Sequence, residues 1–158
     1  NGRKKKFSSK VDISTFEPIN KYFFRDANNI YRGEDPGKPI DENLFPIEEV
    51  DINSFELLVD EFYFNIKENL DGFSNTYYAK DKTTVFINAY GKKFTVFVPE
   101  DLTTFKVLNV RYSKDAKNVY HYGKILEGAD AKSFEADEDH WGKDINGRWT
   151  PVGKLEKE

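Results

Sequence analysis

Aspartate is the residue of this chain whose spacing could do chemistry, because it recurs in two regular motifs. The pentapeptide Asp-x-x-[Ser/Thr]-Phe occurs four times, and so does the tetrapeptide aromatic-x-[Lys/Arg]-Asp. Evenly spaced carboxylates could bind calcium or supply an acid–base pair for hydrolysis. In three of the four copies, however, the two Asp residues are separated by the same fourteen positions. Because the two motifs keep a constant distance from each other, they indicate a repeat protein, and their recurring residues belong to its scaffold.

Each copy contributes the first Asp, the Phe and the second Asp to this repeated set. In chain order the residues are Asp12, Phe16 and Asp26; Asp51, Phe55 and Asp81; Asp101, Phe105 and Asp115; and Asp130, Phe134 and Asp144. An Asp at the start of the pentapeptide can accept hydrogen bonds from backbone N–H groups two or three residues on, which closes a single turn. We expect the four Phe side chains to occupy equivalent buried positions. We also expect the second Asp of each copy to serve a turn rather than a metal, so that calcium leaves the melting temperature unchanged.

The shortest cycle, from Asp101 to Asp130, shows which elements position these residues. Residues 106–112, 119–122 and 124–126 mix aromatic and β-branched side chains with charges, and Gly, Asn and Asp lie between them. Short strands separated by turn residues are typical of an antiparallel meander. We therefore predict an all-β fold of tandem antiparallel β-hairpin or meander repeats. Short one-turn helical connections are expected at the pentapeptide motifs.

The composition fits one folded domain and excludes several classes of partner. The chain has 158 residues, no Cys and a formal net charge of −4. Nucleic-acid binding needs a net basic face, and a membrane span needs a long apolar stretch, so we expect neither. We assign residues 1–10 to a basic flexible leader and residues 11–158 to a single repeat domain of about four copies. A polybasic membrane-surface segment at residues 3–6 is the alternative interpretation of the leader.

The second copy is longer than the others and carries aromatic residues that occur only there. They are Phe62, Tyr63, Phe64, Phe73 and Tyr77. One interpretation is a decayed hairpin that extends the sheet, and the other is an insertion that presents a binding surface. Residues Gly33–Pro46 also occur once. Because a segment found once is free of the packing that every copy shares, we expect a protein partner to contact one of these two segments, with Tyr63 and Tyr77 as the foremost contacts.

The third copy, residues Tyr112–Phe134, resembles the repeat unit of the bacterial DKNYY family. The shared pattern is Tyr-x-Lys-Asp, then Asn, Val-Tyr, Gly-Lys and Gly-Ala-Asp-x-x-Ser-Phe. The resemblance extends over most of the chain after the leader, with departures at Asn65 and Arg148. It implies a bacterial protein, in many members exported, and a fold unit without a known reaction. We accordingly expect the bacterial periplasm or cell envelope rather than the cytoplasm.

Catalytic constellations are scarce in this sequence. The chain has only two histidines, His121 and His140, and no Ser/Cys–His–acid arrangement is evident. The acidic run 137–139 before His140 could bind a divalent metal, but a solvated turn is the simpler interpretation. We expect no catalytic residues, no metal and no cofactor. The hypotheses are a non-enzymatic protein-binding module, including an immunity-type protein that neutralises a basic toxin; a structural envelope-associated repeat protein; and, last, a carboxylate-dependent enzyme.

Overall fold

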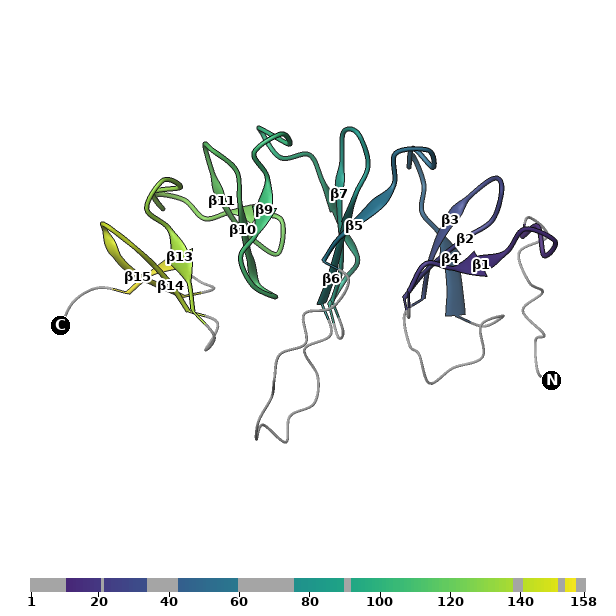
Figure 1. Ribbon diagram of the computed structural model, residues 1–158. Helices are drawn as coiled ribbons and strands as arrows, with labels where there is room; N and C mark the ends of the chain where they lie inside the picture. Colours follow the sequence, from purple (N-terminus) through teal and green to yellow (C-terminus); the bar gives the residue numbers. More distant parts are fainter. Residues whose placement is uncertain are drawn as a thin grey trace, which may run out of the picture. The chain divides into compact units, whose positions relative to one another are not determined.

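The computed structural model describes residues 11–20, 22–33, 43–59, 76–89, 92–137, 141–150 and 153–155. The fold of these residues is all-β, with sixteen short strands in four four-stranded antiparallel sheets that follow one another along the chain (Figure 1). This confirms the predicted fold class. The chain divides into two compact units, residues 1–55 and 56–158, and each is described by itself. The assignment of residues 11–158 to one domain stays a prediction.

The first unit contains one meander, which we call sheet 1. Its strands are β1 (Glu17–Pro18), β2 (Phe23–Arg25), β3 (Ile30–Gly33) and β4 (Leu44–Pro46), hydrogen-bonded in that order. Phe23 and Ile30 are buried because they face the core side of the sheet. The tight β2–β3 connection contains Asp26, the second Asp of the first copy.

The second unit contains three such meanders, each with neighbouring strands in chain order. Sheet 2 comprises β5 (Glu56–Val59), β6 (Thr76–Lys80), β7 (Val85–Ala89) and β8 (Thr95–Phe97). Sheet 3 comprises β9 (Lys106–Val107), β10 (Tyr112–Lys114), β11 (Val119–His121) and β12 (Lys124–Ile125). Sheet 4 comprises β13 (Glu135–Ala136), β14 (Gly142–Asp144), β15 (Gly147–Thr150) and β16 (Gly153–Lys154).

The core of one copy is completed by the Phe of the next pentapeptide. In the first unit the ring of Phe23 on β2 lies 5.6 Å from that of Phe55, edge to face. In the second unit Tyr112 on β10 lies 5.4 Å from Phe134. Phe105 likewise packs against the cluster that contains Tyr78 on β6. Aromatic rings at these separations add to the free energy gained from burial, so the motif Phe joins neighbouring copies.

The four motif Phe side chains are equivalent in position but not in burial, which corrects the prediction that all four are buried. Phe134 is only 1% exposed, whereas Phe16, Phe55 and Phe105 are half-buried. The residue beneath the ring explains the difference between the fourth copy and the first. A Cβ at Gly142 would lie 2.2 Å from Cζ of Phe134, so only glycine lets this ring sink into the core. In the first copy Phe24 fills that place and stacks on Phe16 at 5.8 Å, which leaves Phe16 nearer to solvent.

The unequal burial predicts unequal mutational costs. Phe134→Ala should lower the free energy of unfolding by about 3–5 kcal/mol, because it empties a filled core position. Phe105→Ala, the matched change in the preceding copy, should cost less because its ring already contacts water. Urea unfolding followed by tryptophan fluorescence measures both losses. Equal losses would show that the ring on Gly142 has no special place in the core.

Candidate functional site

The second Asp of the third copy, Asp115, lies at the centre of a closed hydrogen-bond cage. Its Oδ1 accepts from the backbone N–H groups of Lys117 at 2.8 Å and Asn118 at 2.7 Å. Its Oδ2 accepts from the backbone N–H of Asp101 at 3.0 Å and from the hydroxyl of Tyr120 at 2.6 Å. The residue is 3% exposed. With both oxygens engaged, the carboxylate closes the β10–β11 turn and ties it to the start of its own pentapeptide.

The first copy builds the same cage around Asp26. Oδ1 accepts from the N–H groups of Asn28 at 2.8 Å and Asn29 at 2.7 Å. Oδ2 accepts from the N–H of Asp12 at 2.9 Å and the hydroxyl of Tyr31 at 2.6 Å. Two copies with the same four donors establish the cage as part of the repeat unit.

The fourth copy keeps three of the four hydrogen bonds. Asp144 accepts from the N–H groups of Asn146, Gly147 and Asp130 at 2.7, 3.1 and 2.7 Å. Trp149 replaces the tyrosine, and its buried Nε1–H faces this carboxylate without closing a hydrogen bond of ordinary geometry. The conserved element is therefore the pair of turn N–H groups together with the N–H of the first Asp.

The second copy shows the local half of the same arrangement. Oδ1 of Asp81 accepts from the N–H groups of Thr83 at 2.8 Å and Thr84 at 2.7 Å. Phe86 stands where the first and third copies have tyrosine, so no hydroxyl donor is present at that position. In all four copies the second Asp thus accepts from the backbone N–H groups two and three residues on.

The Ser/Thr of the pentapeptide has a defined partner as well. Thr15 and Thr104 accept through Oγ1 from the N–H groups of Ala27 and Ala116, both at 2.9 Å. Ser133 accepts from Ile145 N–H at 3.1 Å in the fourth copy. In the first, third and fourth copies, the pentapeptide thus binds the second Asp through a backbone N–H and the residue after it through a hydroxyl.

The cage fixes the charge states of its members. Burial alone would raise the pKa values of Asp26, Asp115 and Asp144, but the donors around each carboxylate outweigh it and lower them. Burial and the hydrogen bond to Asp26 raise the pKa of Tyr31 to about 12. Each Asp is therefore ionised and each tyrosine neutral near pH 7. Such a carboxylate is a poor proton acceptor and has no oxygen to offer a metal.

Of the predicted partner-binding aromatics, only Tyr77 falls within the described residues. It lies on β6, half-buried, opposite Asn88 on β7. Phe62, Tyr63, Phe64 and Phe73 lie outside the described residues, as does part of Gly33–Pro46. Their role in binding stays a prediction.

The predicted absence of a metal site was also compared with the structure. Within the described ranges, no three or more His, Cys, Asp or Glu side chains gather as metal ligands do. Residues 138–140 of the acidic run are not described, and Oδ1 of Asp137 accepts from the N–H of Trp141 at 2.8 Å. No helix among the described residues is long and apolar enough to cross a membrane.

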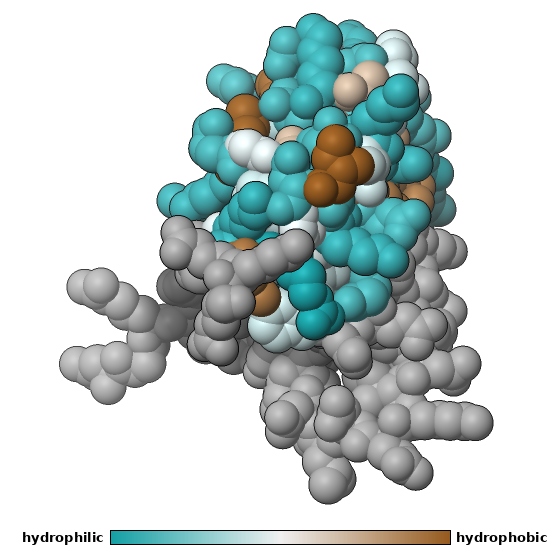
Figure 2. All heavy atoms as spheres, turned by 90° about the vertical axis from the view of Figure 1, so that its left-hand side faces the viewer, coloured by the Kyte–Doolittle hydropathy of each residue, from teal (hydrophilic) through white to brown (hydrophobic). Residues whose placement is uncertain are grey.

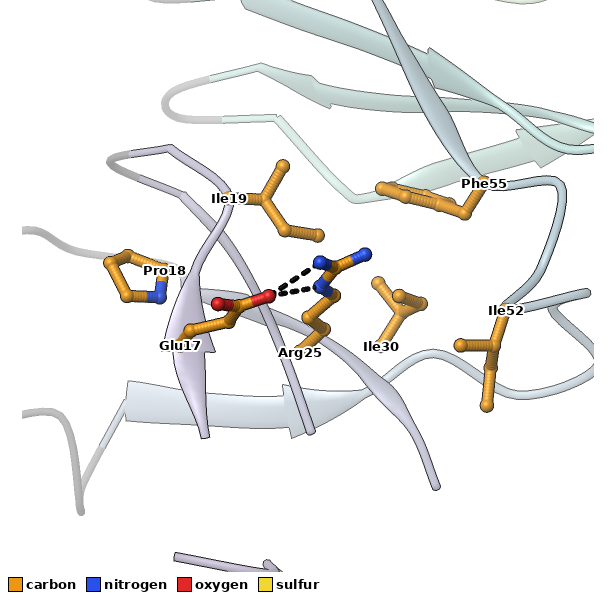
Figure 3. A pocket seen from close by; sticks show the side chains of 7 residues that line it. All are labelled: Glu17, Pro18, Ile19, Arg25, Ile30, Ile52 and Phe55. Atoms are coloured by element: carbon orange, nitrogen blue, oxygen red, sulfur yellow. Dashed lines mark hydrogen bonds and ion pairs between the residues drawn. The ribbon is translucent and has the colours of Figure 1, made fainter. Parts of the chain in front are cut away.

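A surface hollow of about 260 Å³ lies in the first unit (Figure 3). It is lined by Glu17, Pro18, Ile19, Arg25, Ile30, Ile52 and Phe55. Glu17 on β1 and Arg25 on β2 are register partners and form an ion pair, so their charges cancel at the rim. The hollow therefore has both polar walls, from the Glu17–Arg25 pair, and apolar walls, from the isoleucines and Phe55. The sequence analysis did not identify this hollow, because it combines two strands with the following pentapeptide.

Comparison with known proteins supports the predicted resemblance. The model of the DKNYY family matches residues 89–150, which run from the end of β7 through β15. This part of the chain belongs to the DKNYY family. The match is shorter than the resemblance drawn from the motifs, although the cage around Asp26 shows the same unit outside it. No curated protein and no solved structure matches the chain.

Loss of a caged carboxylate should be costly. Asp115→Ala leaves three backbone N–H groups and the hydroxyl of Tyr120 without their acceptor, so the free energy of unfolding should fall by about 3 kcal/mol or more. Asp137→Ala is the control, since this exposed carboxylate has one backbone partner, and its cost should be about 1 kcal/mol or less. Urea unfolding of both variants measures the difference. Similar losses for the two variants would contradict a structural role specific to the cage.

Proposed function

We propose that this chain is a non-enzymatic protein-binding repeat module of a bacterial, exported protein. The observation that carries the proposal is the full engagement of the recurrent polar residues. The carboxylates of Asp26 and Asp115, with the hydroxyls of Tyr31 and Tyr120, are used to hold turns. Residues of this kind could otherwise supply catalysis, so their engagement argues against a carboxylate-dependent enzyme and favours a scaffold that presents surface.

The described surface has features suited to a protein partner. Large apolar side chains are exposed at Ile13, Val96, Val98, Ile125, Trp141, Ile145 and Leu155. In the view of Figure 2, hydrophobic residues stand as separate spots among hydrophilic ones. A mixed surface of this kind is typical of interfaces with a few anchoring contacts and a polar rim. The hollow beside Arg25 adds a concave place with both charged and apolar walls.

The chain's charge bears on the kind of partner. With a formal net charge of −4, the module would attract a basic protein more readily than an acidic one. An immunity-type role, in which the module caps a basic toxin, is one form of this proposal. The periplasm or cell envelope is the compartment in which we place it, because many members of the family are exported.

A structural role in the envelope is the second candidate. The packing between copies favours it, because Phe55 and Phe134 each complete the core of the preceding copy. Repeat proteins that are built by such nearest-neighbour packing can serve as structural elements. A structural element of this kind would need no tight partner.

Binding should map to the segments that occur once. We expect hydrogen exchange of the full chain with its captured partner to show protection within Glu56–Tyr77 or Gly33–Pro46. Tyr63→Ala should weaken binding at least tenfold without lowering the melting temperature, because tyrosine gives large contact area at low entropic cost. Lys143→Gln, which changes an exposed side chain of sheet 4 that was not assigned to binding, is the control and should bind normally. Protection confined to the hairpins around Asp115 and Asp144 would contradict the location, and the absence of any specific partner would favour the structural candidate.

A further inference from the structure

Three cationic residues of the second unit surround His121, and together we call them the cationic cluster. They are Lys92, which precedes β8; Arg111, which precedes β10; and Lys124, the first residue of β12. All three charges act on the imidazole of His121, which ends β11. Lys92 and Lys124 are exposed and Arg111 is half-buried, so the cluster is open to solvent.

Aromatic rings form the base of the cluster. His121 lies 4.8 Å from the ring of Tyr122, edge to face, and 5.3 Å from that of Tyr112. The ammonium of Lys92 lies 5.9 Å from the centroid of Tyr122. These contacts bring residues from two sheets to one place, because Lys92 belongs to the β7–β8 connection and the others to sheet 3.

The backbone that carries Tyr122 is held in an uncommon conformation. Tyr122 has φ 47° and Gly123 φ 79°, so both lie in the left-handed region. A Cβ at Gly123 would lie 2.8 Å from Cδ1 of Phe97 and 2.9 Å from Cγ2 of Thr95, so this turn packs directly on β8. A left-handed tyrosine persists only where its surroundings impose it, and such positions are common at ligand sites. The turn is therefore preformed.

Among the described residues, no recorded ion pair balances the positive charge of the cluster. The ion pairs recorded among the described residues use other cations, namely Arg25, Lys80, Lys117 and Lys143. None of these ion pairs includes Lys92, Arg111 or Lys124. At the base of the cluster, the negative charge of Asp137 helps to raise the pKa of Tyr112. The chain as a whole has a net charge of −4, so this positive charge is local to the cluster. A local excess of positive charge attracts anions.

Two polar atoms beneath the cations are buried without a hydrogen-bond partner among the described residues. They are the hydroxyl of Tyr112, a residue with 0% exposure, and Nε2 of His121. Most buried polar atoms in native proteins are paired, and an exception calls for a physical reason. A ligand with acceptor oxygens next to these atoms would provide one.

The cluster is a departure of the third copy from the repeat. The residue that precedes the first aromatic is Arg111 here, but Tyr22 and Tyr77 in the first two copies. His121 pairs in register with Tyr112, whereas the corresponding position in the second copy is Ile87. The scaffold therefore does not require arginine or histidine at these places.

We propose that Lys92, Arg111 and Lys124, over the base of His121 and Tyr122, form a binding site for an oxyanion, either a carboxylate or a phosphate group. The guanidinium of Arg111 offers a planar fork of donors that matches two oxygens of such a group, and the two lysines add point charges at the rim. The site stands independently of the proposed protein-binding function, because a free small anion and an anionic group on a larger ligand would engage the same donors.

Fixed-pH titration of the full chain tests the site. At pH 6.5, sodium phosphate and sodium acetate are each added to 15N-labelled protein, with sodium chloride at matched ionic strength as the reference. Saturable shifts of the Tyr122 and Gly123 amides and of Arg111 Nε–H are expected with at least one oxyanion. Saturation by phosphate assigns a phosphate site, and saturation by acetate assigns a carboxylate site. Shifts that chloride reproduces, or none that saturate, would overturn the proposal.

Variants separate the cluster from general electrostatics. Arg111→Gln should weaken oxyanion binding at least tenfold, and Lys124→Gln, which alters an exposed side chain, should also weaken it. Lys143→Gln is the control because this lysine is paired with Glu135 in sheet 4, and it should leave the affinity unchanged. An equal loss in Lys143→Gln, or no loss in Lys124→Gln, would show that no specific site exists.

The imidazole of His121 gives a second readout. Burial, together with the charges of Arg111, Lys92 and Lys124, lowers the pKa of His121 to about 4. A bound anion offsets those charges, so saturating sulfate, which stays ionised in acid, should raise this pKa by about one unit or more relative to chloride at equal ionic strength. The His140→Gln variant identifies the resonance of His121 by leaving it as the sole imidazole. An unchanged pKa would contradict binding above His121.

Discussion

The structure depends on one interaction, the closure of each copy by a carboxylate that accepts hydrogen bonds from the backbone of its turn. Asp115 joins the backbone of its own turn to the N–H of Asp101, fourteen residues earlier. Two strands and the pentapeptide are therefore fixed by one side chain. A carboxylate with several N–H and O–H donors is stabilised in its charged form even when buried, whereas an apolar or neutral residue would leave those donors unpaired. This explains why aspartate recurs at each of these places.

Closure by Asp sets the position of the motif Phe, and the Phe joins one copy to the next. Phe55 packs on Phe23, and Phe134 packs on Tyr112. Since the first three copies each pack against the Phe of the next pentapeptide, stability in such an array comes from neighbouring pairs. Residues outside these contacts are free to vary from copy to copy. We therefore assign function to the residues that differ from the repeat pattern, namely the segments found once and the cationic cluster of the third copy.

The repeat made the fold predictable, because spacing alone revealed the strands, the turns and the recurrent Asp and Phe. The burial of each motif Phe was not predictable, because it depends on the residue beneath the ring, and the motif does not specify that residue. It is Gly142 beneath Phe134 and Phe24 beneath Phe16. The cationic cluster was missed for a similar reason. Arg111 lies just before β10, Lys124 begins β12 and Lys92 lies in the β7–β8 connection, so these three residues come together only when the strands pack. The contacts of His121 with Tyr112 and Tyr122 likewise arise only when the strands pack.

The direct test of the account is a carboxyl 13C NMR titration of Asp115. Its pKa should lie below 3.8, the ordinary value of an aspartate side chain, because the surrounding donors stabilise the ionised form by more than burial destabilises it. With a folded pKa below the unfolded one, the cage stabilises the protein above pH 3.8, and that contribution is lost as the pH falls through the folded value. Tyr120→Phe, which reproduces the second copy's Phe86, should raise the pKa by removing one donor. A pKa of Asp115 at or above 3.8, unaffected by Tyr120→Phe, would contradict the claim that the caged carboxylate holds each copy together.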